Sequence, residues 1–215
     1  MESKLMKHID LLLKRYPVLE PIKQDLIDAY LIMEESYAKG GKLLVAGNGG
    51  SASDSEHIVG ELMKSFKMPR KLSSEFSEKL KETDLEFGSV LAENLQGALP
   101  AIALDGHLAL TTAYMNDCEP LLCFAQQING FGKPEDVFLG ISTSGNSKNV
   151  LYAATIAKAK GMKVIGLTGA KDSRLMDFAD VCVKAPNTET YMIQELHLPI
   201  YHCWCLMLED RFFGD

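Results

Sequence analysis

The stretch KLLVAGNGGSASDSEHIVGEL, residues 42–62, decides the fold. It begins with a short apolar run, residues 42–46, passes through a glycine-rich turn, and continues into a segment long enough for a helix. This order predicts a strand of a parallel sheet that is buried on both faces, followed by a helix that crosses back over the sheet. Gly47, Gly49 and Ala52 also match the pattern G-x-G-x-x-A of dinucleotide-binding turns.

Four later apolar runs repeat this arrangement along the chain. Right-handed crossovers between five such strands give an α/β fold, a three-layer α/β/α domain with a five-stranded parallel sheet. Helices are predicted within residues 1–40, and one long helix is predicted from about Thr188 to Phe212, with Pro199 inside it, where proline usually kinks a helix. We expect residues 1–215 to form a single domain. The four later runs are residues 101–104, 137–141, 164–167 and 181–183.

Residues 68–98 do not follow this pattern. They are charged and loosely periodic, and most of them read KLSSEFSEKLKETDLEFGSVLAENLQ. We interpret them as an insertion of helical pieces and loops. The insertion either borders the functional site or is a solvated excursion from the surface, and the sequence leaves both possibilities open.

The composition indicates a soluble globular protein. The 215 residues are 47% hydrophobic, which is enough for one sizeable core, and the net charge of −7 argues against broad binding of nucleic acid or of a membrane surface. No apolar run reaches the roughly 18 to 20 residues of a membrane span, and the charged, amphipathic start of the chain does not predict a signal peptide. Five cysteines without a C-x-x-C pair predict reduced thiols and a cytoplasmic location.

A second loop, residues 142–147, follows the third predicted strand and reads STSGNS. In parallel sheets ligands bind beyond the carboxyl ends of the strands, and the free N–H groups at the start of the next helix attract anions. Four clustered hydroxyl groups therefore predict a phosphate site in this loop. A simpler alternative is that the last serine only caps the helix. The hydroxyl groups belong to Ser142, Thr143, Ser144 and Ser147.

The dinucleotide interpretation of the first loop does not hold. A dinucleotide-binding fold needs an acidic residue at the end of the next strand, about 20 residues further on. Here that region is still helical in pattern, and the next apolar run ends near Asp105. A P-loop is excluded because no Gly-Lys-Ser/Thr follows the glycines. We therefore expect no nucleotide cofactor.

Two helices carry side chains suited to chemistry. His57 and Glu61 are four residues apart, so they share one face of the helix after the first loop, although such a pair is more often a surface pair than a set of ligands. The long C-terminal helix adds Gln194 and His202, which are separated by about 12 Å along its axis and about 80° around it. The side chains of Gln194 and His202 can bind the same metal ion only if they lean toward each other along the helix axis, or if they come from different subunits.

The motifs match the sugar isomerase (SIS) domain family in order, spacing and residue type. Within this family the chain is most similar to the phosphoheptose isomerases, and the similarity runs from about Leu26 to Phe212. The motifs that carry the resemblance are Asn48-Gly49-Gly50-Ser51, His57 with Glu61, the run at residues 141–147, Leu167-Thr168-Gly169, and Ile193-Gln194-Glu195 with His202.

The resemblance implies a five-stranded parallel sheet in flavodoxin-like order and a homotetramer with its sites at subunit interfaces. The implied reaction converts the phosphosugar sedoheptulose 7-phosphate to D-glycero-D-manno-heptose 7-phosphate through an enediol. A carboxylate and an imidazole suit the acid–base steps, and zinc suits polarisation of the carbonyl group. By the family pattern, the phosphate contacts are Ser142, Thr143, Ser144 and Ser147, the sugar contacts are Asn48, Gly49, Gly50, Ser51, Asn116, Asp117 and Gln194, the zinc ligands are His57, Glu61, Gln194 and His202, and the acid–base pair is Glu61 and His202.

The chain departs from the family pattern at several positions. Ser65 stands where the family usually has an arginine. Lys64, Lys67 or Arg70 would then have to take over that role. Asp105-Gly106-His107 replaces the usual Thr-Thr-Asp after the second strand. These differences bear on which sugar phosphate is the substrate more than on the class of reaction.

Two other functions are compatible with the same fold. One is a non-catalytic binding protein, either a partner of a bacterial replication initiator or a sensor of phosphosugars. The other is an isomerase that acts on a different phosphosugar. Neither binding role requires an acid–base pair, and the chain keeps both Glu61 and His202. The sequence therefore favours the isomerase.

Overall fold

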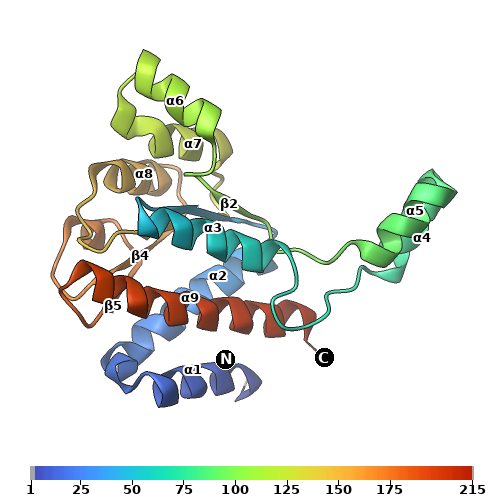
Figure 1. Cartoon of the computed structure of the whole chain (residues 1–215), viewed down its shortest axis with the longest axis horizontal. Helices are drawn as coiled ribbons and strands as arrows, with labels where there is room; N and C mark the ends of the chain where they lie inside the picture. Colours follow the sequence, from blue (N-terminus) through green and yellow to red (C-terminus); the bar gives the residue numbers. More distant parts are fainter. Residues whose placement is uncertain (1–2, 215) are drawn as a thin grey trace.

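The computed structural model describes residues 3–214. It forms a three-layer α/β/α domain around a five-stranded sheet in the order β2-β1-β3-β4-β5, with all neighbouring strands parallel (Figure 1). The predicted fold class and its flavodoxin-like strand order are thereby confirmed. The elements are α1 (Ser3–Arg15), η1 (Pro17–Ile22), α2 (Lys23–Ala38), β1 (Leu43–Ala46), α3 (Gly50–Met63), α4 (Ser74–Thr83), α5 (Leu85–Asn94), β2 (Ala101–Ala103), α6 (Leu108–Asp117), η2 (Pro120–Leu122), α7 (Cys123–Phe131), β3 (Val137–Ile141), α8 (Lys148–Ala159), β4 (Lys163–Gly169), η3 (Arg174–Asp177), β5 (Val181–Ala185) and α9 (Thr190–Phe213).

Each apolar run of the sequence coincides with one strand, because burial on both faces selects apolar residues throughout. β4 is longer than its apolar run. It continues through Thr168 and Gly169, which are buried although neither is an aliphatic residue. The strand ends Ala46, Ile141 and Gly169 lie at the same edge of the sheet, so the loops that follow them meet there.

The sheet separates two apolar layers. Leu43 and Val45 of β1 face a core that they share with α1, α2, α3 and α9, whereas Leu44 and Ala46 face a second core with α7 and α8. This division follows from the strand geometry, in which successive side chains point to opposite faces. α3 and α9 therefore lie on the same side of the sheet, as Figure 1 shows.

α9 is anchored in the larger core. It continues without interruption through Pro199, and its buried Trp204 donates a hydrogen bond from Nε1 to the Leu26 carbonyl oxygen of α2, at 3.0 Å. The predicted N-terminal helices thus serve to hold α9 against the sheet. No helix within residues 3–214 is long and apolar enough to cross a membrane.

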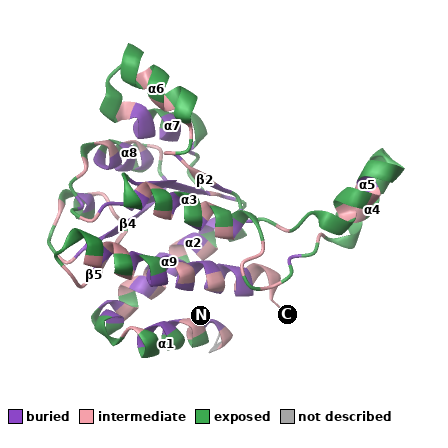
Figure 2. Cartoon of the chain, viewed as in Figure 1, coloured by how far each residue is buried: buried purple, intermediate pink, exposed green. Residues whose placement is uncertain are grey.

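Residues 74–94 form a helical arm, made of α4 and α5, that projects from the body of the domain (Figure 1). Local hydrogen bonds begin both helices: Ser73 Oγ accepts from the Phe76 N–H at 3.2 Å, and Asp84 Oδ1 accepts from the Phe87 N–H at 2.7 Å. Gly88 is the one residue of the arm that is buried, and Figure 2 shows the rest as largely exposed. Within one chain the arm is therefore an excursion from the surface.

Candidate active site

The loop between β1 and α3 depends on its glycines. Gly49 has a φ of 58°, in the left-handed region that glycine adopts without strain. Gly50 opens α3 directly beside the carboxamide of Gln194, and a β-carbon at this position would lie 2.6 Å from Gln194 Nε2. The glycines thus allow the loop backbone and Gln194 to approach each other.

Asn48 connects the first loop to the second. Its carboxamide exchanges two hydrogen bonds with that of Asn149 in the first turn of α8, at 3.0 and 2.8 Å. Asn149 was not predicted as a site residue, although its place two residues after Ser147 was a usable signal. Ser51, another predicted sugar contact, is 3% exposed in the first turn of α3.

Asp105, which follows β2, supports the first loop from below. Its Oδ2 accepts hydrogen bonds from the Gly47 N–H at 3.3 Å and from Ser55 Oγ. Burial raises the pKa of Asp105, and the hydrogen bonds from Ser55 and Gly47 oppose that rise. The sequence showed this aspartate only as a departure from the family pattern, whereas the structure shows that it ties β2 to the loop.

The second loop presents its hydroxyl groups around a tight turn. Gly145 has a φ of 61° at the centre of the turn. Ser147 Oγ lies 3.1 Å from Ser142 Oγ and makes no capping hydrogen bond to α8. Ser147 therefore does not act as a simple helix cap here, and its hydroxyl group remains directed into the loop.

A cavity of about 190 Å³ opens beside the second loop, near the end of β4 and the start of α9. Of the four predicted phosphate contacts, Thr143 and Ser144 line it, whereas Ser142 and Ser147 do not. Lys171 and Asn187 also line it. Neither residue was predicted, although Lys171 lies only two residues beyond the end of β4, where loop residues of a parallel sheet commonly face the ligand.

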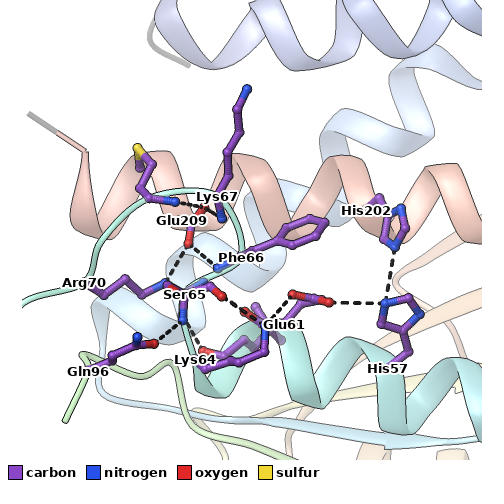
Figure 3. A network of polar contacts seen from close by, with 12 residues as sticks. His57, Glu61, Lys64, Ser65, Phe66, Lys67, Arg70, Gln96, His202 and Glu209 are labelled. Carbon is purple, nitrogen blue, oxygen red and sulfur yellow. Dashed lines mark hydrogen bonds and ion pairs between the residues drawn. The ribbon is translucent and has the colours of Figure 1, made fainter. Parts of the chain in front are cut away.

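His57, Glu61 and His202 form a cluster between α3 and α9 (Figure 3). His57 Nε2 lies 3.2 Å from Glu61 Oε1 and 3.5 Å from His202 Nε2. Burial lowers the pKa of His202 and the neighbouring His57 lowers it further, while Glu61 opposes the shift. His57 and Glu61 are therefore more than a surface pair, because His57 also contacts the imidazole ring of His202 on α9.

Two further side chains hold His57 from behind. His57 Nδ1 lies 3.0 Å from the Tyr201 hydroxyl oxygen, and that hydroxyl donates to Asp54 Oδ1 at 3.1 Å. Burial raises the pKa of Asp54, while the hydrogen bond from Tyr201 and the nearby His57 oppose the rise. Neither Tyr201 nor Asp54 was predicted as a site residue, although Asp54 lies about one helical turn before His57.

Gln194 does not join this cluster within one chain. It lies beside Gly50 at the start of α3, whereas His57 is seven residues further along the same helix, or about 10 Å. α3 and α9 run side by side in the same direction. Gly50 and His57 on α3 are therefore about as far apart as their neighbours Gln194 and His202 on α9. The structure thus brings together three of the four predicted zinc ligands.

The three clustered residues are of types that bind zinc, and two of their three pairwise distances suit a shared ion. Nitrogen and oxygen ligands at about 2.0–2.1 Å from a tetrahedral zinc ion lie about 3.4 Å from one another, close to the two distances at His57 Nε2. Glu61 lies near enough to His202 to affect its pKa, but the part of the chain that the structure describes contains no ready-made group of three or more His, Cys, Asp or Glu around a metal position. The Glu61 and His202 side chains would have to turn toward a shared ion.

The residues proposed to replace the family arginine have different roles. Arg70 is buried and donates to Glu209 Oε1 at 2.8 Å and to the carbonyl oxygens of Leu62 and Glu61 (Figure 3). Its guanidinium group therefore holds the end of α3 and faces no ligand. Lys64 is exposed and its Nζ lies 3.4 Å from Glu61 Oε2, so it is the candidate that reaches the cluster.

Asn116 and Asp117 lie at the end of α6 and are exposed. The Asn116 side chain donates to Asp117 Oδ1 at 2.8 Å. α6 packs against η2 and α7, on the side of the sheet opposite α3 and α9 (Figure 1). One chain therefore does not bring this pair to the His57 cluster.

The fold and the two polar loops define a SIS domain protein. The family model of the SIS domain matches residues 85–169. The phosphoheptose isomerase of Francisella tularensis superposes with a TM-score of 0.75 and 29% identity, over 98% of this chain and 100% of that one. The phosphoheptose isomerase of Neisseria gonorrhoeae superposes with a TM-score of 0.72 and 26% identity, over 97% and 98% of the two chains.

Sequence relatives make the assignment more specific. A phosphoheptose isomerase of Nitratiruptor is 35% identical over 211 residues, which cover 98% of this chain and 97% of the relative. One of Aneurinibacillus thermoaerophilus is 36% identical over 181 residues, or 84% of this chain and 78% of the relative. The chain therefore belongs to the phosphoheptose isomerase family.

Proposed function

We propose that the protein is an aldose–ketose isomerase that converts sedoheptulose 7-phosphate to D-glycero-D-manno-heptose 7-phosphate. The observation that carries this proposal is the cluster in which Glu61 and His202 both contact His57 Nε2, at 3.2 and 3.5 Å, within a chain of the phosphoheptose isomerase family. Such a cluster supplies a carboxylate and an imidazole at one place, as a proton shift between adjacent carbons requires.

The reaction moves a proton between two neighbouring carbon atoms through an enediol. One member of the pair Glu61 and His202 removes the proton from carbon, and the other delivers a proton to the carbonyl oxygen. The two exchange roles as the enediol collapses to the other sugar.

The second loop would hold the phosphate. Ser142, Thr143, Ser144 and Ser147 offer hydroxyl donors, and the first turn of α8 adds free N–H groups and the positive end of its dipole. Lys171 lines the adjacent cavity beside Asp172 and would bring a positive charge to the phosphate. Asn48, Gly49 and Gly50, which lead into α3, would contact the sugar together with Gln194, which lies beside Gly50.

His57, Glu61 and His202 would hold a zinc ion, and Gln194 would join them only from a second subunit. When bound, the ion would polarise the carbonyl group and stabilise the negative charge on its oxygen. A homotetramer with sites at subunit interfaces is part of the proposal, because Asn116 and Asp117 can reach a sugar only from another copy. The free thiols of all five cysteines support a reducing, cytoplasmic location.

The proposal is tested by turnover of sedoheptulose 7-phosphate with the purified protein. Glu61→Gln and His202→Ala should each lower kcat by about 10²–10⁴-fold while the protein keeps its unfolding midpoint. Glu56→Gln, on the same helix and exposed, is the matched control and should keep full activity. Unchanged turnover in both site variants would refute this acid–base pair.

Two further outcomes separate the alternatives. Turnover of another ketose phosphate, but not of sedoheptulose 7-phosphate, would support the reaction class and refute the substrate. Tight binding of the sugar without any turnover would favour the non-catalytic sensor. For the phosphate site, Ser144→Ala should raise KM with little change in kcat, since it removes a contact present in both ground and transition states.

A further inference from the structure

The buried Tyr201 and the half-buried Asp54 lie behind the predicted zinc ligand His57 and support it. Tyr201 is 1% exposed, and its ring meets the His57 ring edge-on with centroids 5.5 Å apart. Its hydroxyl oxygen lies 3.0 Å from His57 Nδ1 and 3.1 Å from Asp54 Oδ1. The three side chains thus form a line of two hydrogen bonds that ends at the imidazole.

The direction of these bonds follows from the number of hydrogen atoms. A phenol has one hydrogen to donate, and an ionised carboxylate only accepts. Tyr201 therefore donates to Asp54 and must accept from His57. The proton of the neutral His57 ring then lies on Nδ1, and Nε2 carries the free lone pair.

This arrangement decides what His57 presents to the cluster. With the proton on Nδ1, the Nε2 lone pair points toward Glu61 Oε1 at 3.2 Å and His202 Nε2 at 3.5 Å. In its Nε2–H form His202 can donate to this lone pair, but an ionised Glu61 carboxylate can only accept, so His57 Nε2 and Glu61 Oε1 repel each other unless a cation lies between them. The opposite tautomer would place an N–H there and would remove His57 as a ligand.

We propose that Asp54 and Tyr201 are positioning residues that hold His57 in its Nδ1–H form and so make its Nε2 available to a divalent cation. The consequence for catalysis rests on the proposed function, whereas the tautomer itself does not. Asp54 and Tyr201 act through His57 and touch no substrate. A carboxylate that accepts a hydrogen bond from a metal-binding histidine commonly raises the affinity of the site for its metal. Here the Tyr201 hydroxyl group lies between the Asp54 carboxylate and His57.

The tautomer can be observed directly in chelator-treated protein. Long-range ¹H–¹⁵N correlation spectra of protein labelled on its histidine rings, recorded at pH 8, distinguish the Nδ1–H form from the Nε2–H form. The His57 signals are assigned by their loss in His57→Asn. The wild-type protein should show the Nδ1–H form, and observation of the Nε2–H form would overturn the proposal.

Two variants test whether Asp54 and Tyr201 set the Nδ1–H tautomer of His57. Asp54→Asn offers an amide N–H to the Tyr201 oxygen, so that the phenol can donate to His57, and the ring should switch toward Nε2–H. Tyr201→Phe removes the relay and should leave a mixture of both forms. Unchanged spectra in both variants would show that the support does not set the tautomer.

Zinc binding supplies an independent measurement. Titration of chelator-treated protein with zinc should give a Kd that is weakened about 10–100-fold in Asp54→Asn and in Tyr201→Phe. Tyr37→Phe is the matched control, because it also removes a phenol hydroxyl, one that donates to the Pro100 carbonyl oxygen at 3.2 Å, away from His57. The control should change neither the tautomer nor the zinc Kd.

The outcomes separate this proposal from the proposed function. If the spectra show the predicted forms but the wild-type protein does not turn over the sugar, the support stands and the isomerase assignment fails. If turnover is present but zinc affinity is the same in wild-type protein, Asp54→Asn and Tyr201→Phe, the positioning role fails. Unfolding midpoints close to that of Tyr37→Phe would show that the two variants remain folded.

Discussion

The pair α3–α9 and the arm α4–α5 are both packed helix pairs, but they are held in place by different means. α3 and α9 both contribute side chains to the larger apolar core and are joined to each other by long-range polar contacts. The arm has Gly88 as its one buried residue, and local caps begin its helices. Short helices are marginal without tertiary burial, so the arm should be the less stable of the two.

The difference explains where the candidate site lies. Catalytic side chains must be held within a fraction of an ångström, and rigid elements provide this better than mobile ones. Glu209, which is fully buried on α9, accepts from Arg70 Nε and from the N–H groups of Phe66 and Lys67, each at 2.8 Å. This network fixes the chain directly beyond α3, so Glu61 and His57 are supported from both ends.

The largest predicted effect is the loss of that network. Glu209→Ala should leave the Arg70 guanidinium group buried without its carboxylate and should lower the free energy of unfolding by about 3–5 kcal/mol, measured by urea denaturation. Glu195 is exposed on the same helix, so Glu195→Ala is the control and should change the free energy of unfolding by less than about 0.5 kcal/mol. Equal effects of the two variants would contradict the importance of the network.

The next effect concerns pH and a second buried group of α9. His197 is buried and its Nε2 donates to the Thr168 carbonyl oxygen at 3.1 Å. Burial lowers the pKa of His197 to about 4 from 6.5, although that hydrogen bond opposes the shift. Between these values the unfolded chain binds more protons than the folded protein, so stability should fall as the pH drops from 6.5 to 4.

Across this pH range, the shifted pKa of His197 accounts for a change of about 3 kcal/mol in the free energy of unfolding. Urea denaturation at several pH values should show a steep loss of stability in the wild-type protein. The same series with His197→Asn, which keeps a donor for the Thr168 carbonyl oxygen, should show a smaller slope. Identical slopes would mean that other groups dominate acid destabilisation.

A change inside the arm should act locally. A β-carbon at Gly88 would collide with the Leu80 carbonyl oxygen and would lie 2.7 Å from the Lys81 nitrogen, so Gly88→Ala should separate α4 from α5. Amide exchange in the arm should become about 5–30-fold faster, while exchange in α3 and α9 stays unchanged. Faster exchange in α9 would show that the arm and the core unfold together.

A matched glycine in α3 sharpens this contrast. A β-carbon at Gly60 would meet no atom within 4 Å. Gly60→Ala should therefore raise the free energy of unfolding by about 0.5–1 kcal/mol, because alanine favours the helix more than glycine does. Destabilisation by this variant would reveal a contact with another subunit on that face.

The smallest effect is expected for a surface ion pair of the arm. Lys79 Nζ lies 2.6 Å from Glu75 Oε1, but the two side chains are 63% and 77% exposed. Lys79→Ala should change the free energy of unfolding by less than about 0.5 kcal/mol, because water and salt screen such pairs. A larger loss, measured by urea denaturation, would indicate that the arm is covered in an assembly.

Local patterns alone predicted the strands, the N-terminal helices and the two polar loops. The run at residues 137–141 became β3 without change, and His57 and Glu61 share a helix face as their spacing predicts. These features depend on alternation along strands, on the period of 3.6 residues along helices, and on turn chemistry, all of which act over a few residues.

The sequence by itself therefore determined the sheet, its flanking helices and the residue types of the site. Only the tertiary structure decided that His202 meets His57 across 145 residues, that Tyr201 supports it, and that Gln194 lies two turns away. The physical reason is register. How far α9 slides along α3 is set by the packing of buried side chains such as Trp204, and no local pattern in the chain records that distance.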